Sequence, residues 1–139
     1  MAVDTREELL DGASFAEEEA VISRSVDKRR REFTTARVCA REALRMLGRP
    51  ATAILPGVRG EPLWPDGAIG SITHCTGYRG AVLGTRSVVV AIGIDAEQNQ
   101  PLPDGVLAAI GVPEERRLIR ELLREHPSIR WDRLLFSAK

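Results

Sequence analysis

Two acidic residues directly follow the most apolar stretch of the chain. Residues 87–94 read SVVVAIGI, an uncharged run rich in β-branched side chains, which predicts a buried strand. Asp95 and Glu97 follow at once, separated by Ala96. In an extended segment, residues two apart point to the same side and lie about 6.5–7 Å apart, a span suited to two carboxylates on one divalent cation. Both could equally be solvated loop residues, and the pattern alone leaves the two interpretations open.

A second set of candidate residues is basic and lies on a helix predicted over residues 25–47. At 100° per residue, Arg29 falls within the apolar face of this helix and Arg37 at its edge. A guanidinium in an apolar face needs an anion or a hydrogen-bonding partner. That partner could be a phosphate, or an internal carboxylate such as Glu61 or Asp66. Alternatively, the first helical turns lie outside the core. The other arginines of the helix are interpreted as a solvated face or a patch for an acidic protein.

The next candidates are a loop and a histidine. Residues 51–66 are punctuated by Pro and Gly, which fix the path of a loop and permit close approach of a ligand to its backbone. The loop lacks the GKS or GKT of a nucleotide-binding P-loop. His74 is one of only two histidines, and a lone histidine is most often structural. A catalytic dyad with Cys75 is excluded because neighbouring strand residues face opposite ways.

The composition limits the classes of function. With 139 residues, the chain has the length of one domain, and its 20 basic and 20 acidic residues leave no net charge to attract nucleic acid or a membrane surface. No apolar run reaches the roughly 18 residues of a membrane helix, and the first residues do not read as a signal peptide. Cys39 and Cys75 fit a reducing cytoplasm and lack metal-binding spacing.

The elements that would position these residues indicate an α+β fold, in which the long helix packs on an antiparallel β-meander and short helices follow. The strands of the meander are expected at about residues 68–74, 81–83 and 87–94. Short helices are expected at about 104–110 and 113–125 and from Trp131 onward. The predicted regions are an acidic segment over 1–24, loosely ordered or a short helix, then 25–100 and 101–139.

Within the acidic segment, Glu17 to Glu19 are interpreted as a solvated face. At the other end, the apolar stripe that starts at Trp131 is still running at Lys139, with no capping residue after it. This pattern predicts that the sequence is a piece of a longer protein.

Four motifs together resemble a known family: REFTTARVCAREAL, RGEPLWPDGAIGSITHCTGYRGAV, GIDAE and WDRLLFSAK. They resemble the Sfp-type 4′-phosphopantetheinyl transferases, especially the actinobacterial group, over about residues 25–139. The resemblance implies the first half of a pseudo-two-fold fold. It also implies a cytoplasmic enzyme that transfers phosphopantetheine from coenzyme A to a serine of an apo acyl or peptidyl carrier protein. Such an enzyme would use Mg²⁺ or Mn²⁺, release 3′,5′-ADP and serve fatty-acid, polyketide or nonribosomal-peptide carriers.

The resemblance also assigns roles to residues. The expected coenzyme A-binding residues are Arg29, Arg37, Arg59, Gly60, Glu61, Pro62, Thr73, His74, Asp95 and Lys139. The expected metal site consists of the Asp95 and Glu97 carboxylates with the Ala96 carbonyl. His74, Asp95 and Glu97 are the expected catalytic residues.

One departure from the family leaves alternatives open. The family places a glutamate directly after the lysine that Lys139 matches, and that position lies past the end of this sequence. The isolated chain could therefore be inactive. It could also be a catalytically silent coenzyme A-binding half that pairs with or regulates a separate half, or an unrelated Mg²⁺-dependent enzyme acting on a nucleotide or pyrophosphate.

Overall fold

The structure, a computed structural model, describes residues 1–9 and 14–139 and consists of two compact units, 1–96 and 97–139. Residues 10–13 of the expected acidic segment lie outside the described residues.

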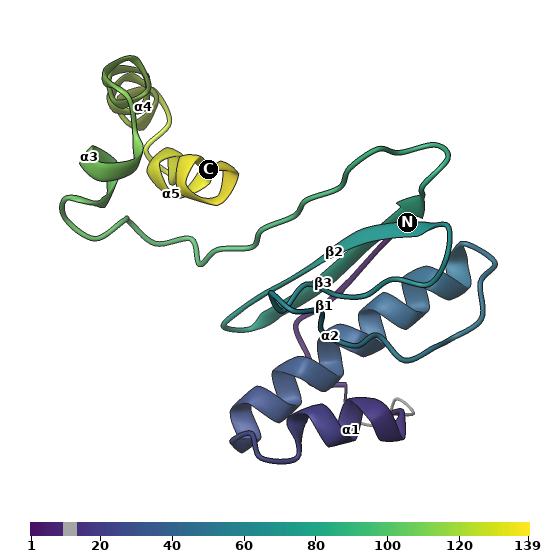
Figure 1. Cartoon of the computed structure of the whole chain (residues 1–139). Helices are drawn as coiled ribbons and strands as arrows, with labels where there is room; N and C mark the ends of the chain where they lie inside the picture. Colours follow the sequence, from purple (N-terminus) through teal and green to yellow (C-terminus); the bar gives the residue numbers. More distant parts are fainter. Residues whose placement is uncertain (10–13) are drawn as a thin grey trace. The chain divides into compact units, whose positions relative to one another are not determined.

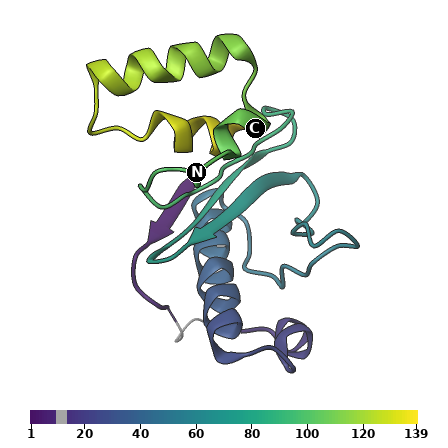
Figure 2. The same cartoon turned by 90° about the vertical axis from the view of Figure 1, so that its left-hand side faces the viewer.

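The first unit is a helix packed on a three-stranded antiparallel sheet. Its elements are β1 (Ala2–Thr5), α1 (Ala16–Ile22), α2 (Asp27–Met46), β2 (Ala68–Cys75) and β3 (Tyr78–Thr85). The strand order is β1-β3-β2, so β3 is central and β2 is an edge strand. Helix α2 lies along one face of the sheet, and α1 lies beside its N-terminal part (Figures 1 and 2). The predicted α+β class is confirmed.

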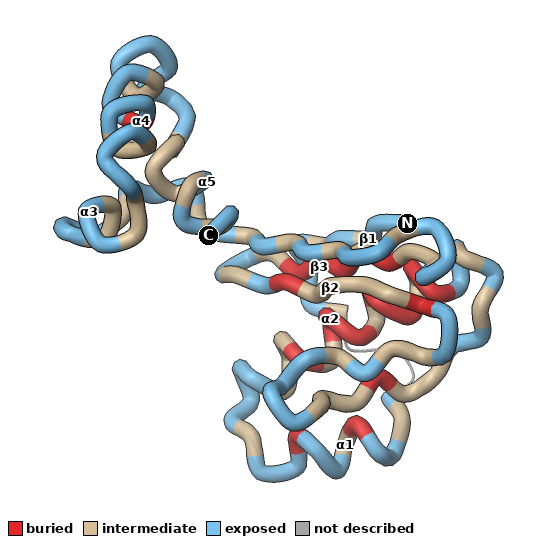
Figure 3. The backbone as a smooth tube through the Cα atoms, turned by 45° about the horizontal axis from the view of Figure 1, so that its top comes forward, coloured by how far each residue is buried: buried red, intermediate tan, exposed pale blue. Residues whose placement is uncertain are grey.

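Small side chains let α2 approach the sheet closely. Ala40 and Ala43 are fully buried, as are the leucines that meet them, Leu44 from the helix and Leu83 from β3. These buried positions lie between the helix and the sheet (Figure 3). A leucine in place of Ala43 would overpack this contact and cost about 1–3 kcal/mol. The helix ends at Met46, and Gly48 follows in the left-handed conformation that favours glycine, with φ +71°.

The β2–β3 hairpin decides which side chains face α2. Its two-residue turn pairs Cys75 with Tyr78. Because side chains alternate along a strand, Ile72 and His74 share the face of Ala81 and Leu83, which are buried against α2. The intervening Thr73 points to the opposite face. The hairpin therefore presents His74 on the helix side of the edge strand and Thr73 on the other side.

The third strand is not the one that the sequence predicts. Residues 87–94 form no strand, and Val88 and Val90 are 81% and 93% exposed. The edge of β3 that a third strand could pair with is taken by β1, so 87–94 has no hydrogen-bonding partner there. The segment instead rests on the sheet face away from α2. A Cβ added at Gly84 would meet Val89 and Ile92 at 3.3 and 3.1 Å.

A buried ion pair joins α1, α2 and the loop that follows α2. The carboxylate of Glu18 accepts bonds of 2.8 and 3.0 Å from Arg41 Nη1 and one of 2.8 Å from the Ile54 amide. Glu18 is 2% exposed and Arg41 is 8% exposed. The predictions that Glu18 lies on a solvated face and that Arg41 belongs to a solvated patch are therefore wrong. Each charge is buried because the other satisfies it.

The second unit contains the short helices that the sequence predicts: α3 (Val106–Ile110), α4 (Pro113–Glu125) and α5 (Trp131–Ala138). Pro113 occupies the first turn of α4, and Glu115 accepts a bond of 2.9 Å from the Val112 amide, which caps the helix. Asp132 of α5 accepts a bond of 2.9 Å from the Leu102 amide. Among the described residues, no helix combines the length and apolar character needed to cross a membrane.

Candidate functional site

A cavity of about 290 Å³ opens in the first unit beside α2. Its lining residues come from the end of α1, from α2, from the loop after α2 and from the edge strand β2. Five of the predicted coenzyme A-binding residues line this cavity: Arg29, Arg37, Gly60, Pro62 and His74. The structure thus brings together residues that are up to 45 positions apart in the sequence.

Two arginines of α2 supply positive charge to the cavity. Arg29 is exposed near the start of the helix, whereas Arg37, about 12 Å further along the axis, is buried. Arg37 Nε donates to the Ile54 carbonyl at 3.2 Å, and its guanidinium lies 3.8 Å from the centre of the Phe33 ring. Burial lowers the pKa of Arg37 to about 10, and the nearby Arg29 and Arg41 also lower it, against the opposite effect of Glu18. Arg37 is therefore held rigidly and is charged at neutral pH.

The loop wall is a small hairpin closed by backbone bonds. The Gly57 amide donates to the Glu61 carbonyl at 2.7 Å, and the Leu63 amide donates to the Leu55 carbonyl at 2.8 Å. The Glu61 carboxylate accepts the Arg59 amide at 2.8 Å, inside the hairpin. Gly60 has φ +85°, and a Cβ there would meet nothing within 4 Å. Its requirement for glycine is therefore conformational rather than steric.

Only some of the loop residues expected to bind coenzyme A reach the cavity. Gly60 and Pro62 line the cavity, whereas Arg59 and Glu61 are exposed and are not lining residues. The coenzyme A-binding roles expected of Arg59 and Glu61 remain predictions.

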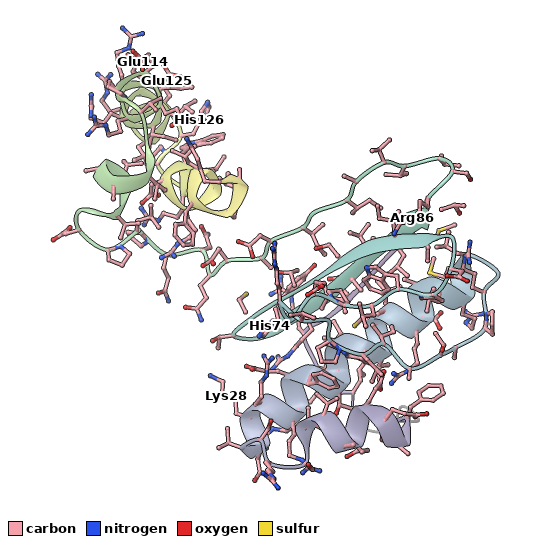
Figure 4. All side chains as sticks on the ribbon, viewed as in Figure 1. Lys28, His74, Arg86, Glu114, Glu125 and His126 are labelled. Carbon is pink, nitrogen blue, oxygen red and sulfur yellow. The ribbon has the colours of Figure 1, made fainter. Side chains whose placement is uncertain are left out.

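The third wall carries the histidine. His74 lies at the hairpin end of the sheet, above the N-terminal half of α2, where Lys28 marks the start of the helix (Figure 4). Its Nε2 is 3.8 Å from Glu32 Oε2, and the two side chains are 41% and 13% exposed. Glu32 also lines the cavity. Sequence reasoning missed Glu32, although its position three residues after Arg29 places both side chains on one helix face.

Thr73 connects the other face of β2 to the acidic motif. Its Oγ1 accepts the Ala96 amide at 2.8 Å and donates to Asp95 Oδ1 at 3.4 Å. Thr73 is buried, whereas Asp95 is exposed. Neither lines the cavity. The hydroxyl of Thr73 therefore fixes the end of the 86–96 segment and orients one oxygen of the Asp95 carboxylate.

The predicted metal ligands span the boundary of the two units. Asp95 and Ala96 end the first unit, and Glu97 begins the second, where its Oε2 lies 3.2 Å from Arg133 Nη1. In the part of the chain that the structure describes, no group of three or more His, Cys, Asp or Glu residues could hold a metal ion. Two carboxylates and a carbonyl remain the candidate ligands, and the metal site stays a prediction.

Lys139 belongs to the second unit, where its Nζ lies 3.0 Å from Glu115 Oε2. The hydrogen bond from the Val112 amide lowers the pKa of Glu115, and the Lys139 ammonium lowers it further. The coenzyme A-binding role expected of Lys139 is likewise a prediction.

Comparison with known proteins gives the family. Residues 17–84 match the 4′-phosphopantetheinyl transferase N-terminal domain. This match covers α1, α2, the loop hairpin, β2 and most of β3, and so includes every wall of the cavity. This part of the chain is a 4′-phosphopantetheinyl transferase N-terminal domain, from the family that the motifs predicted.

Individual relatives support the same conclusion. The chain is 54% identical over 125 residues to the 4′-phosphopantetheinyl transferase Svp of Streptomyces mobaraensis. The aligned region covers 90% of this chain and 51% of the relative. It is 56% identical over 124 residues to the 4′-phosphopantetheinyl transferase PptT of Mycobacterium tuberculosis, covering 88% and 53%. It is 34% identical over 116 residues to the enterobactin synthase component D of Salmonella typhimurium, covering 81% and 46%. The chain spans about half the length of the curated relatives it matches.

Proposed function

We propose that this chain supplies the coenzyme A-binding half of a 4′-phosphopantetheinyl transferase, which moves phosphopantetheine from coenzyme A to a serine of an apo acyl or peptidyl carrier protein. The observation that carries the proposal is the cavity in which Arg29, Arg37 and His74 converge from α2 and β2. Coenzyme A bears a 3′-phosphate and a pyrophosphate. A site for it needs several separated cations and hydrogen-bond donors, and this cavity provides them.

Each wall has a role in this proposal. Arg29 and Arg37 bind the 3′-phosphate on the ribose side, and Arg37 is held ready by its bond to the Ile54 carbonyl. Gly60 and Pro62 form the backbone wall against which the adenosine part rests. His74 donates to a phosphate oxygen from the sheet side. These residues bind and orient the donor, so that the carrier serine can attack the β-phosphorus in line and 3′,5′-ADP can leave.

A divalent cation is part of the proposal. Mg²⁺ commonly binds one or two carboxylates together with substrate phosphates, and Asp95, the Ala96 carbonyl and Glu97 fit such a donor set. When bound, Mg²⁺ would neutralise charge on the pyrophosphate. Thr73 donates to one Asp95 oxygen through its hydroxyl, whereas the Glu97 carboxylate pairs with Arg133.

Mass spectrometry tests the transfer directly. The transferase of which this chain is the proposed half is incubated with coenzyme A, Mg²⁺ and each of several apo carrier proteins. Transfer raises the mass of a carrier by one phosphopantetheine and releases 3′,5′-ADP. The same mixture without coenzyme A is the control. No mass change in any carrier would contradict the proposed transfer.

A second candidate function is a coenzyme A-binding half without transferase activity. The ion pair between Glu97 and Arg133 favours this second candidate. The Glu97 carboxylate, which a metal ion would need as a ligand, is already paired with the Arg133 guanidinium. This candidate predicts that calorimetry detects coenzyme A binding to a chain that modifies no carrier. An unmodified carrier and no binding of coenzyme A would contradict both candidates.

A further inference from the structure

Glu32 is an unexpected residue to find in a phosphate-binding cavity. Its side chain is 13% exposed and lines the cavity with Arg29, Arg37 and His74. It is the one carboxylate among the cavity's described lining residues. A phosphate that binds these cations must approach this negative charge as well.

From this arrangement we infer that Glu32 sets the affinity of the cavity for anions: its carboxylate weakens the binding of every phosphate, so that only a ligand with further contacts binds tightly. The inference rests on the proposed function, because it concerns the same cavity.

Electrostatics gives the direction of the effect. Glu32 Oε2 lies 3.8 Å from His74 Nε2, so a phosphate that binds the imidazole comes close to this carboxylate. Like charges about 4 Å apart repel by about 1 kcal/mol in water and by more at a partly buried site. Such a penalty corresponds to at least about a fivefold loss of affinity for an anion.

The other charged groups near Glu32 do not remove this effect. Arg29 and Arg37 share its helix, His74 faces it from β2, and Arg37 is already engaged with the Ile54 carbonyl. Glu32 offsets part of the positive potential that the two arginines present to an incoming anion. Inorganic phosphate makes no apolar contacts that could compensate for this repulsion. A nucleotide-like ligand can compensate through its apolar contacts with Phe33, Pro56 and Pro62, which also line the cavity.

The test compares three variants with the wild-type chain. Glu32→Gln removes the charge and keeps the shape, and Glu32→Asp keeps the charge. Glu42→Gln is the matched control, because Glu42 is also on α2 but pairs with Arg45 at 2.6 Å and does not line the cavity. Calorimetric titrations use two probes, inorganic phosphate and 3′,5′-ADP, and circular dichroism checks that each variant folds.

Glu32→Gln should bind inorganic phosphate at least about fivefold more tightly than wild type, and 3′,5′-ADP should gain at least as much. Glu32→Asp and Glu42→Gln should stay within about twofold of wild type, and the gain should shrink at high salt. Unchanged or weaker phosphate binding by a folded Glu32→Gln chain would overturn the inference. Failure of wild type to bind 3′,5′-ADP, with tighter phosphate binding by Glu32→Gln, would instead count against the proposed function alone.

Discussion

The hydroxyl of Thr73 lies between the Ala96 amide, at 2.8 Å, and the Asp95 carboxylate, at 3.4 Å, and so ties the edge strand β2 to the acidic motif 22 residues later. Neighbouring residues of β2 thereby serve two features of the proposed site. His74 faces the cavity beside α2, and Thr73 orients Asp95 on the opposite face of the sheet.

Thr73→Val should loosen the end of the 86–96 segment while leaving the shape of the side chain almost unchanged. The Ala96 amide loses its acceptor, which costs about 1–3 kcal/mol for a buried donor and less at this partly buried position. Hydrogen exchange measured by NMR should show faster exchange of the Ala96 amide. Thr73→Ser keeps the hydroxyl and should exchange at the wild-type rate. Equal protection in the valine variant would show that the hydroxyl does not hold the segment.

Glu18→Gln should strongly destabilise the first unit. The substitution leaves the Arg41 guanidinium buried without its counter-charge, and breaking a buried pair in this way costs about 3–5 kcal/mol. Urea unfolding followed by circular dichroism measures the loss. Glu19→Gln is the matched control, because Glu19 pairs with Arg30 at the surface and should contribute at most about 1 kcal/mol. Similar losses for the two variants would contradict the role assigned to Glu18.

Arg29→Ala should weaken binding of 3′,5′-ADP by about tenfold, since a charge-assisted hydrogen bond contributes about 1.5 kcal/mol or more. Arg29 is the better residue to test because Arg37 also supports the Ile54 loop, so that its loss would change the fold. Arg45→Ala removes an arginine from the same helix outside the cavity and should not affect binding. Calorimetric titration of both variants with 3′,5′-ADP measures these affinities. Equal affinity in wild type and Arg29→Ala would remove Arg29 from the site.

Asp95→Ala should abolish Mg²⁺-dependent transfer while the chain stays folded, because the exposed carboxylate makes one weak bond to Thr73 and little else depends on it. The carrier-mass assay measures transfer, and circular dichroism measures folding. Transfer by the alanine variant at the wild-type rate would disprove the metal role of Asp95.

Local sequence signals predicted much of the fold. The apolar face of α2, the proline at the start of α4 and the stripe of α5 depend on residues a few positions apart, and each helix occurs where its pattern placed it. Residues 87–94 show where such signals fail. Their β-branched composition predicts a strand beside β3, but β1, which is distant in the sequence, already pairs with that edge of β3.

In the candidate site, too, the sequence predicted some residues, and others depend on tertiary packing. Arg29, Arg37 and His74 were predicted from residue type and family motif, and the cavity brings them together. Glu18 and Glu32 were missed because a carboxylate looks the same in a sequence whether it is solvated or buried. Only the packing of α1 and β2 against α2 decides which partner each carboxylate meets.

The most direct test of the account compares coenzyme A with dephospho-coenzyme A, which lacks only the 3′-phosphate. Calorimetric titration of the chain with each compound isolates the contribution of that phosphate. If Arg29 and Arg37 bind it, coenzyme A should bind at least about tenfold more tightly, and Arg29→Ala should remove most of the difference. Equal affinity of the wild-type chain for the two compounds would contradict the assignment of this cavity to the 3′-phosphate of coenzyme A.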